Sequence, residues 1–87
     1  MEFDWDEEKR RTNLIKHGID FMTATQIFWG RFREVPAKTS LEGQEARYVG
    51  FGYVNSVAVA VVYVKVGKSI RIISARRASR RERKKYY

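Results

Sequence analysis

The side chains best suited to chemistry in this sequence are arginines near the end of the chain. Residues 69–87 contain Arg71 and then a dense basic run in which Glu82 is the only acid. From Lys65 onward the net charge is +9, whereas the whole chain of 87 residues carries +8, so the excess charge lies in the last quarter. A planar guanidinium group can bond two phosphate oxygens at once. This stretch therefore predicts a surface that binds a polyanion, with phosphate as the expected target.

The elements that would hold these arginines are a strand and a short helix. The apolar residues that follow Ser69 predict a strand that ends near Ala75. The pattern Ser79-x-x-Glu82 fits a capping box, which predicts a basic helix from about Ser79 to the C-terminus. A basic tail can also serve only to keep a small protein soluble. Arginines at the end of a strand are held in place, however, which favours a binding surface.

The composition limits the kinds of site that this chain can build. It has no cysteine and one histidine, His17, so neither a disulfide nor a Cys- or His-rich metal site is expected. Its longest apolar run, residues 57–64, is far shorter than the ~18 residues that predict a membrane span. No carboxylate cluster, glycine-rich phosphate loop or nucleophile triad is visible. We therefore expect one soluble, cytoplasmic domain without a metal, a cofactor or a membrane partner.

The chain opens with a short alternating segment and a surface helix. Phe3 and Trp5 alternate with acidic residues, which predicts either a short edge strand or an extended lead-in. A helix over about residues 6–17 follows. Its few apolar residues, Leu14 and Ile15, predict that it docks on the protein by one narrow stripe.

Capping residues mark the ends of this helix and the start of a second. Asp6 is the expected N-cap of the first helix, and Gly18 is suited to the position just past its end. Asp20 is the expected N-cap of a second helix over about residues 21–29, whose apolar residues recur at helical spacing. The first third of the chain is therefore predicted to be a helical hairpin.

Strand patterns fill the rest of the chain. The predicted strands are residues 31–35, 47–53, 57–66 and 69–75, with a polar loop over residues 37–45 and tight turns at residues 55–56 and 67–68. Pro36 marks the first as an edge strand, and the apolar residues on both faces mark the third as central. Gly50 and Gly52 share one face of the second strand and leave room for a helix or another backbone to approach closely. We expect an α+β fold with an antiparallel sheet of about four strands, three of them in a long meander, and helices packed on one face.

Each end of the chain carries a recognisable motif. The residues near the N-terminus are Trp5-Asp6, Lys9, Asn13, Lys16-His17-Gly18, Phe21, Ala24 and Phe28. Those near the C-terminus are Arg71, Ile73-Ser74, Arg76-Arg77-Ala78, Glu82-Arg83 and Tyr86. Both motifs resemble those of the BrnT family, the ribonuclease toxins of bacterial type II toxin–antitoxin pairs. The middle of the chain matches only in character, although Arg47 stands where the family commonly has an arginine that opens a strand.

The resemblance implies a RelE-like fold and a metal-independent endoribonuclease that arrests translation. It also implies a cognate antitoxin, a DNA-binding, BrnA-like protein that masks the toxin in a hetero-oligomeric complex and represses the shared operon. A non-catalytic basic module that binds RNA, DNA or the ribosome is the alternative, because it predicts the same basic surface.

Metal-independent RNA cleavage needs three tasks, which are proton removal from the 2′-OH, stabilisation of the phosphorane charge and protonation of the leaving oxygen. The candidate catalytic residues are Arg71, Arg76, Arg77, Arg47, His17, Glu82 and Tyr86. The arginines would stabilise charge, and the other three are the candidates for proton transfer. The expected RNA-binding residues are Lys16, Arg80, Arg81, Arg83, Lys84 and Lys85.

Each candidate for proton transfer also has an ordinary structural interpretation. His17 could be an ordinary residue at a helix end whose ring nitrogens bond to nearby groups. Glu82 could be only the partner of Ser79 in the capping box. Tyr86 could anchor the last helix on the sheet or stack on a base. Arg47 could be an edge or ion-pair arginine. The sequence leaves these alternatives open.

Two surfaces are candidates for the antitoxin. An acidic segment of the partner could cover the basic residues 71–85, so that binding and inhibition would be one event. Alternatively, the partner could bind the helical hairpin through contacts with Trp5, Phe21 and Phe28. The first surface carries the charge and is the one that we expect.

Overall fold

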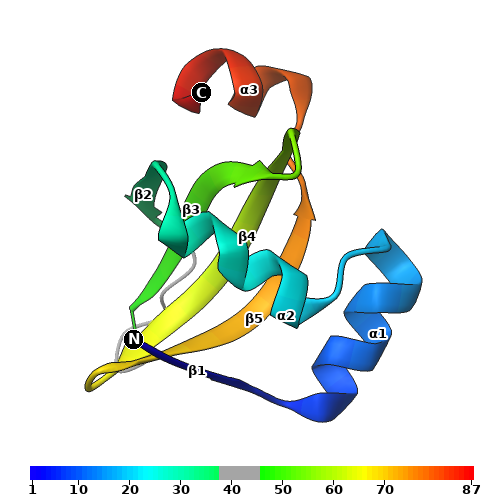
Figure 1. The fold of residues 1–87 in the computed structure, drawn as a ribbon, viewed down its shortest axis with the longest axis vertical. Coiled ribbons are helices and arrows are strands. Elements are labelled where there is room, and N and C mark those ends of the chain that lie inside the picture. Colours follow the sequence, from blue (N-terminus) through cyan, green and yellow to red (C-terminus); the bar gives the residue numbers. More distant parts are fainter. Residues whose placement is uncertain (38–45) are drawn as a thin grey trace.

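A computed structural model describes residues 1–37 and 46–87 of the chain, so most of the loop expected at residues 37–45 lies outside the described residues. The elements follow the order β1 Glu2–Trp5, α1 Glu7–His17, α2 Phe21–Ala24, 3-10 helix η1 Thr25–Trp29, β2 Phe32–Pro36, β3 Arg47–Val54, β4 Val57–Val66, β5 Ser69–Arg77 and α3 Arg80–Tyr86. Figure 1 shows a twisted sheet with α2 and η1 across its front, α1 beside β5 and α3 beyond one end of the strands. None of the described helices is long and apolar enough to cross a membrane.

The sheet has five strands in the order β1-β5-β4-β3-β2, rather than the four expected. Strands β3 to β5 form the predicted three-stranded antiparallel meander, with β4 in the centre of the sheet. Strand β2 pairs antiparallel with β3 at the edge, as expected. The extra strand is β1, which pairs parallel to β5 with Phe3 opposite Ile70. The sheet is therefore mixed and not purely antiparallel. Of the two interpretations of Phe3 and Trp5, the edge strand is correct, because the free edge of β5 offers backbone groups that β1 can satisfy.

The main core lies between the sheet and the segment formed by α2 and η1. Phe21, Ile27 and Phe28 from this segment pack on Tyr63 and Ile72, and all five side chains are buried. The segment formed by α2 and η1 can approach the sheet closely because β3 has glycines on that face, as predicted. A Cβ atom added at Gly50 or Gly52 would lie 3.0 Å from an atom of Ile27, closer than an ordinary van der Waals contact. The second helix is shorter than expected, because residues 25–29 continue as a 3-10 helix.

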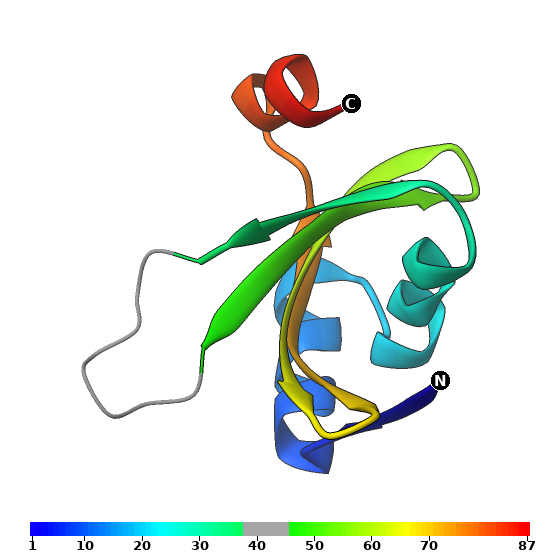
Figure 2. The same cartoon turned by 90° about the vertical axis from the view of Figure 1, so that its left-hand side faces the viewer.

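The helices do not all pack on one face, which corrects the sequence-based expectation. In Figure 2, α2 and η1 lie to the right of the sheet, whereas α3 sits above its upper end. Tyr86 of α3 stacks on Phe51, with ring centroids 4.2 Å apart and planes 9° apart. Phe51 belongs to the face of β3 opposite the glycines, because successive side chains of a strand alternate. Strand β4 is apolar on both faces, so both faces must be shielded from water. The segment formed by α2 and η1 packs on one face, and α3 shields part of the other.

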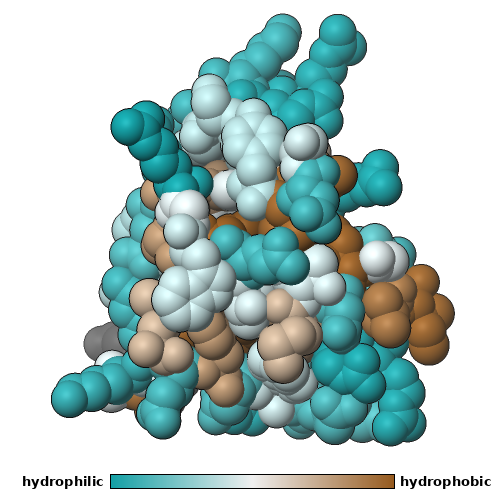
Figure 3. Space-filling view, in the orientation of Figure 1, coloured by the Kyte–Doolittle hydropathy of each residue, from teal (hydrophilic) through white to brown (hydrophobic). Residues whose placement is uncertain are grey.

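Helix α1 docks through a polar residue rather than through the expected apolar stripe. Leu14 and Ile15 are 40% and 83% exposed, and Asn13 is the buried residue of the helix. The Asn13 side chain donates to the carbonyl of Ala75 at 2.8 Å and accepts from its N–H at 3.1 Å. Strand β1 pairs with β5 only as far as Ile72. At Ala75, the side-chain amide of Asn13 therefore makes the hydrogen bonds that a neighbouring strand would otherwise make. Figure 3 shows the exposed apolar residues over α1 and the long hydrophilic side chains that project from the region of α3.

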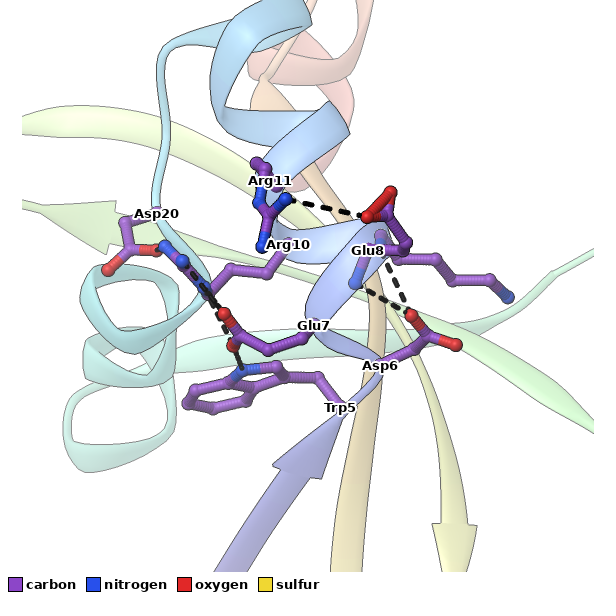
Figure 4. A network of polar contacts seen from close by, with 8 residues as sticks. Trp5, Asp6, Glu7, Glu8, Arg10, Arg11 and Asp20 are labelled. Atoms are coloured by element: carbon purple, nitrogen blue, oxygen red, sulfur yellow. Dashed lines mark hydrogen bonds and ion pairs between the residues drawn. The ribbon is translucent and has the colours of Figure 1, made fainter.

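The start of α1 is fixed by the predicted N-cap and by an ion-pair network (Figure 4). The Asp6 carboxylate accepts from the backbone N–H groups of Glu8 and Lys9. Arg10 pairs with Glu7 at 2.8 Å and with Asp20 at 3.0 Å. Asp20 occupies the predicted N-cap position of α2, but its side chain makes no capping hydrogen bond and pairs with Arg10 instead. Gly18 ends α1 in the left-handed conformation with φ of 72°, as predicted.

Candidate functional site

The sheet brings Arg47 and Arg71 to one face from strands on either side of β4. Arg47 pairs with Val64 of β4, and Val64 in turn pairs with Arg71 of β5. Residues that pair across a sheet share a face, and neighbouring strands are about 4.8 Å apart. The two arginine Cα atoms therefore lie about 10 Å apart. This is the face that carries Phe51, and we call it the arginine face.

Asp4 extends the same row across β5 to the edge strand. It pairs with Arg71 in the strand register, and its carboxylate lies 3.1 Å from the guanidinium group. Both side chains are substantially exposed, so this ion pair is weak and can exchange for another anion. No local sequence pattern links Asp4 to Arg71, because their proximity depends on the parallel pairing of β1 with β5.

Arg76 joins the arginine face through the next part of β5. Its register partner is Ala60, and Ala60 pairs with Phe51. The two guanidinium nitrogens of Arg76 bond to the two carboxylate oxygens of Glu82 at 2.7 and 2.9 Å. This fork holds the side chain in one orientation and, together with the charge of Glu82, raises the pKa of Arg76.

Glu82 is engaged from both sides. Besides the bonds from Arg76, it accepts from the backbone N–H of Ser79 at 2.8 Å, which completes the predicted capping box. Hydrogen bonding to Arg76, and then to Ser79, lowers the pKa of Glu82 to about 2 despite partial burial. A carboxylate in this state accepts a proton poorly, so the geometry suits Glu82 to orienting Arg76 and α3.

Arg77 does not lie with the other arginines. Strand β5 continues to Arg77 rather than ending near Ala75, so successive side chains still alternate between faces. Arg76 and Arg77 therefore point to opposite sides of the sheet. Arg77 borders a hollow of about 490 Å³ that is also lined by His17, Gly18 and Asp20. The sequence pattern of adjacent arginines could not show this separation, because the end of the strand was placed too early.

His17 stands at the edge of a second hollow, a groove of about 360 Å³ between α1 and β5. The groove is lined by residues of α1 and by Ile73 and Ser74 of β5, and Lys16 and Lys9 contribute cations to it. His17 is exposed and borders both this groove and the hollow beside Arg77. The imidazole is thus accessible to a substrate and is not enclosed by the protein.

The C-terminal helix presents its cations to solvent and its tyrosines to the sheet. The exposed basic side chains are Arg80, Arg81, Arg83, Lys84 and Lys85. No ion pair among the described residues involves any of them. Tyr86 stacks on Phe51, and the Tyr87 hydroxyl donates to the carbonyl of Val59 at 2.8 Å. The geometry supports the anchoring interpretation of Tyr86.

A polar cluster on the opposite face was also missed. Glu34 of β2 accepts a hydrogen bond from the Tyr63 hydroxyl and pairs with Lys65 at 2.8 Å. Burial and the neighbouring Glu34 carboxylate raise the pKa of Tyr63. These contacts join β2 to β4 across β3 on the α2 side, so we assign them to the fold. Within residues 1–37 and 46–87, no three His, Cys, Asp or Glu side chains are grouped to hold a metal ion.

The comparison with known families identifies a relationship over most of the chain. A family described as "Ribonuclease toxin, BrnT, of type II toxin-antitoxin system" matches residues 5–82. The matched residues include helices α1 and α2 and all of the strands that carry Arg47, Arg71 and Arg76. No curated protein matches the chain.

Proposed function

Since this chain belongs to the BrnT family of type II toxin–antitoxin ribonuclease toxins, we propose that it is a metal-independent endoribonuclease that acts on the arginine face. The family implies an RNA substrate and an antitoxin partner. The observation that carries the proposal is the pairing of Arg47 and Arg71 with the same residue, Val64, on a face that also holds Arg76. Guanidinium groups at three positions on one face of the sheet would form a positive surface for the phosphates of an RNA strand.

In this proposal, Arg47 and Arg71 hold the scissile phosphate and stabilise the charge that develops on it. Arg71 exchanges its exposed pair with Asp4 for a phosphate oxygen. Arg76, oriented by Glu82, contributes further positive charge. The strands fix the backbone positions of these arginines, and the two bonds to Glu82 also fix the side chain of Arg76.

We assign proton removal from the 2′-OH to His17, which is exposed and lines a groove with Ser74, three residues along β5 from Arg71. Water would protonate the leaving 5′-oxygen. Histidine is well suited to exchange protons at neutral pH. Glu82 serves in orientation, and Tyr86 serves as an anchor for α3. Arg77, on the opposite face, would contribute to long-range attraction of RNA rather than to the chemical step.

Metal independence is part of the proposal and rests on the donor set of the sequence. The chain contains one histidine and no cysteine. The arginine face supplies positive charge directly, which is the task that a divalent ion performs in metal-dependent nucleases. Cleavage would use the 2′-OH as nucleophile and leave a 2′,3′-cyclic phosphate or 3′-phosphate end.

A non-catalytic binding module remains the second candidate. The observation in its favour is the row of exposed cations on α3, which lies beyond the arginine face and would bind a nucleic acid without cleaving it. The two functions differ in what happens to the RNA and not in whether it binds.

The proposed test is expression of the chain alone in a bacterium, followed by incubation of the purified protein with RNA in EDTA. We expect growth arrest, degraded RNA and cleavage that persists in the chelator. The double variant Arg47→Ala/Arg71→Ala, produced at the same level, should allow growth. Normal growth and intact RNA, with soluble and folded wild-type protein, would exclude the ribonuclease and favour the non-catalytic binding module. Loss of cleavage in EDTA, restored by a divalent ion, would contradict metal independence.

We further propose that the antitoxin is a DNA-binding, BrnA-like protein that covers the arginine face and α3 with an acidic segment. The other surface considered, the helical hairpin, loses most of its contact residues, because Phe21 is fully buried and Phe28 is 6% exposed. Both proteins would meet their RNA and DNA in the cytoplasm. A hetero-oligomer with the masked toxin would be inactive until the antitoxin is removed.

A further inference from the structure

A hollow of about 540 Å³ lies on the arginine face where β2 and β3 meet the end of α3. Its lining includes Arg31, Arg33, Tyr53, Tyr86 and Tyr87. Phe51 forms part of its wall and is only 5% exposed. The hollow combines an aromatic surface with two arginines, and the catalytic arrangement proposed above uses neither.

The strand register places this hollow on the same face as Arg47. Arg33 pairs with Phe51, so the two share a face, and Tyr53 shares it because it is two residues further along β3. Arg47 belongs to the same alternating set. Four residues of a strand separate Arg47 from Phe51, a distance of about 13 Å. RNA held at Arg47 can therefore extend into the hollow.

The aromatic rings of the hollow are fixed against one another. Tyr87 meets Phe51 edge-on at 6.0 Å and Tyr53 edge-on at 5.1 Å. The hydrogen bond from the Tyr87 hydroxyl to Val59 fixes the ring that supports Tyr53. Tyr53 nevertheless remains 56% exposed. It is a held aromatic side chain with much of its surface uncovered, which is what a stacking platform requires.

The charge at the rim is positive. Arg31 and Arg33 are exposed, and no ion pair among the described residues involves either. Guanidinium groups beside an aromatic platform suit a nucleotide, whose base stacks and whose phosphate binds arginine. A protein partner would meet the same aromatic rings but would need acidic side chains at both arginines.

We propose that this hollow is a subsite for one base of single-stranded RNA, which stacks on Tyr53 while an adjacent phosphate binds Arg31 and Arg33. The proposal rests on the proposed function, since the subsite would hold a nucleotide that flanks the cleaved bond. Base stacking tolerates sequence, so the subsite increases affinity without strong base preference. The gain would appear in binding and in KM more than in kcat, because the platform lies away from the reacting phosphate.

The test uses a short 2′-O-methyl oligonucleotide, which binds but lacks the 2′-OH for cleavage, and a set of the same oligonucleotide with one base removed at each position in turn. Tyr53→Ala should weaken binding about tenfold, whereas Tyr53→Phe, which keeps the ring, should bind like the wild type. One abasic position should weaken wild-type binding by a similar factor. Tyr53→Ala should add no further loss with that oligonucleotide, because both changes remove the same contact.

Failure of the subsite can be distinguished from failure of the proposed function. If the wild-type protein cleaves RNA but Tyr53→Ala binds normally, the subsite is wrong and the ribonuclease stands. If the protein never cleaves RNA yet shows the Tyr53 and abasic effects together, the subsite stands on a binding module. Weaker binding of the antitoxin by Tyr53→Ala, with unchanged binding of RNA, would identify the hollow as a protein contact and overturn the proposal.

Discussion

The side-chain amide of Asn13 bonds to both backbone groups of Ala75, which lies 62 residues further along the chain. Asn13 is 6% exposed and also donates to the carbonyl of Ile19. One side chain therefore connects α1, the start of the second helical segment and the edge of β5. This contact positions α1 and forms one wall of the groove that holds His17.

Asn13→Ala should destabilise the fold. The substitution leaves the backbone N–H and C=O of Ala75 without the partner that α1 supplies, and unsatisfied buried groups cost about 1–3 kcal/mol each. We expect the free energy of unfolding, measured by urea denaturation, to fall by about 2–4 kcal/mol. Thr12→Ala, one residue earlier and exposed, is the control and should change it by no more than about 0.5 kcal/mol. Equal effects of the two variants would mean that Asn13 contributes only helix propensity.

Removal of one arginine from the arginine face should reduce cleavage strongly. Arg47→Ala and Arg71→Ala should each lower kcat by about a hundredfold or more, the usual effect of losing one donor to a charged transition state. Arg77→Ala is the matched control, because it makes the same change at another arginine of β5 whose side chain points to the opposite face of the sheet. It should lower kcat by less than about tenfold, as expected of a residue that acts only through the general field. Single-turnover cleavage of RNA measures all three, and a larger loss for Arg77→Ala than for Arg71→Ala would show that the catalytic face is wrong.

The stability conferred by Glu82 should depend on pH in a defined direction. Its pKa is lowered from 4.5 to about 2 in the folded protein, so the charged form is favoured by folding. Its contribution is therefore fully present above about pH 4.5 and is lost as the pH falls towards about 2. Glu82→Gln should lower the free energy of unfolding at neutral pH by about 1 kcal/mol.

The difference between this variant and the wild type should narrow between those two pH values, as followed by urea denaturation. Glu8→Gln is the control, since Glu8 is exposed and its contact with Arg11 is long, at 3.6 Å. It should show a smaller effect at neutral pH. A Glu82 effect that stays constant down to about pH 2 would mean that the ion pair with Arg76 contributes nothing to stability.

The cations of α3 should determine the salt dependence of RNA binding. Each neutralised phosphate on a single strand contributes roughly 0.7 to the slope of log K against log salt. Arg80→Ala, Arg81→Ala and Arg83→Ala should each reduce the slope by up to about that amount and weaken binding a little. Arg11→Ala, which removes an exposed cation from α1, is the control and should leave the slope unchanged. A flat salt response of the wild type would show that α3 does not contact RNA.

The antitoxin should protect the basic surface from hydrogen exchange. If an acidic segment covers the arginine face and α3, amide protection should increase across residues 71–85 when the partner is added. The helical hairpin, residues 6–29, is the internal control and should change little. The opposite pattern, with protection confined to the hairpin, would place the partner on the hairpin, where Ile15 and Met22 are 83% and 61% exposed.

The sequence by itself determined the elements whose signals are local. The capping box of Ser79 and Glu82, the cap of Asp6 and the left-handed glycine after α1 each depend on residues within a few positions of one another, and the structure contains all three. The apolar run of β4 identified the central strand, because only a strand covered on both sides can be apolar on both faces. The two glycines of β3 were identified as the site of close approach by a helix for a similar reason.

Tertiary structure alone decided which chemical groups meet. The parallel pairing of β1 brings Asp4 to Arg71, and the register across β4 brings Arg47 to the same face, although no local pattern connects these residues. Two more residues of β5 place Arg76 and Arg77 on opposite faces, because strand side chains alternate. Asn13 was noted only as a residue of the family motif, and its bonds to Ala75 depend on the free edge of β5, 62 residues further along the chain. Strand pairing is set by contacts between distant segments, so the residues of a site built across strands cannot be grouped from sequence spacing alone.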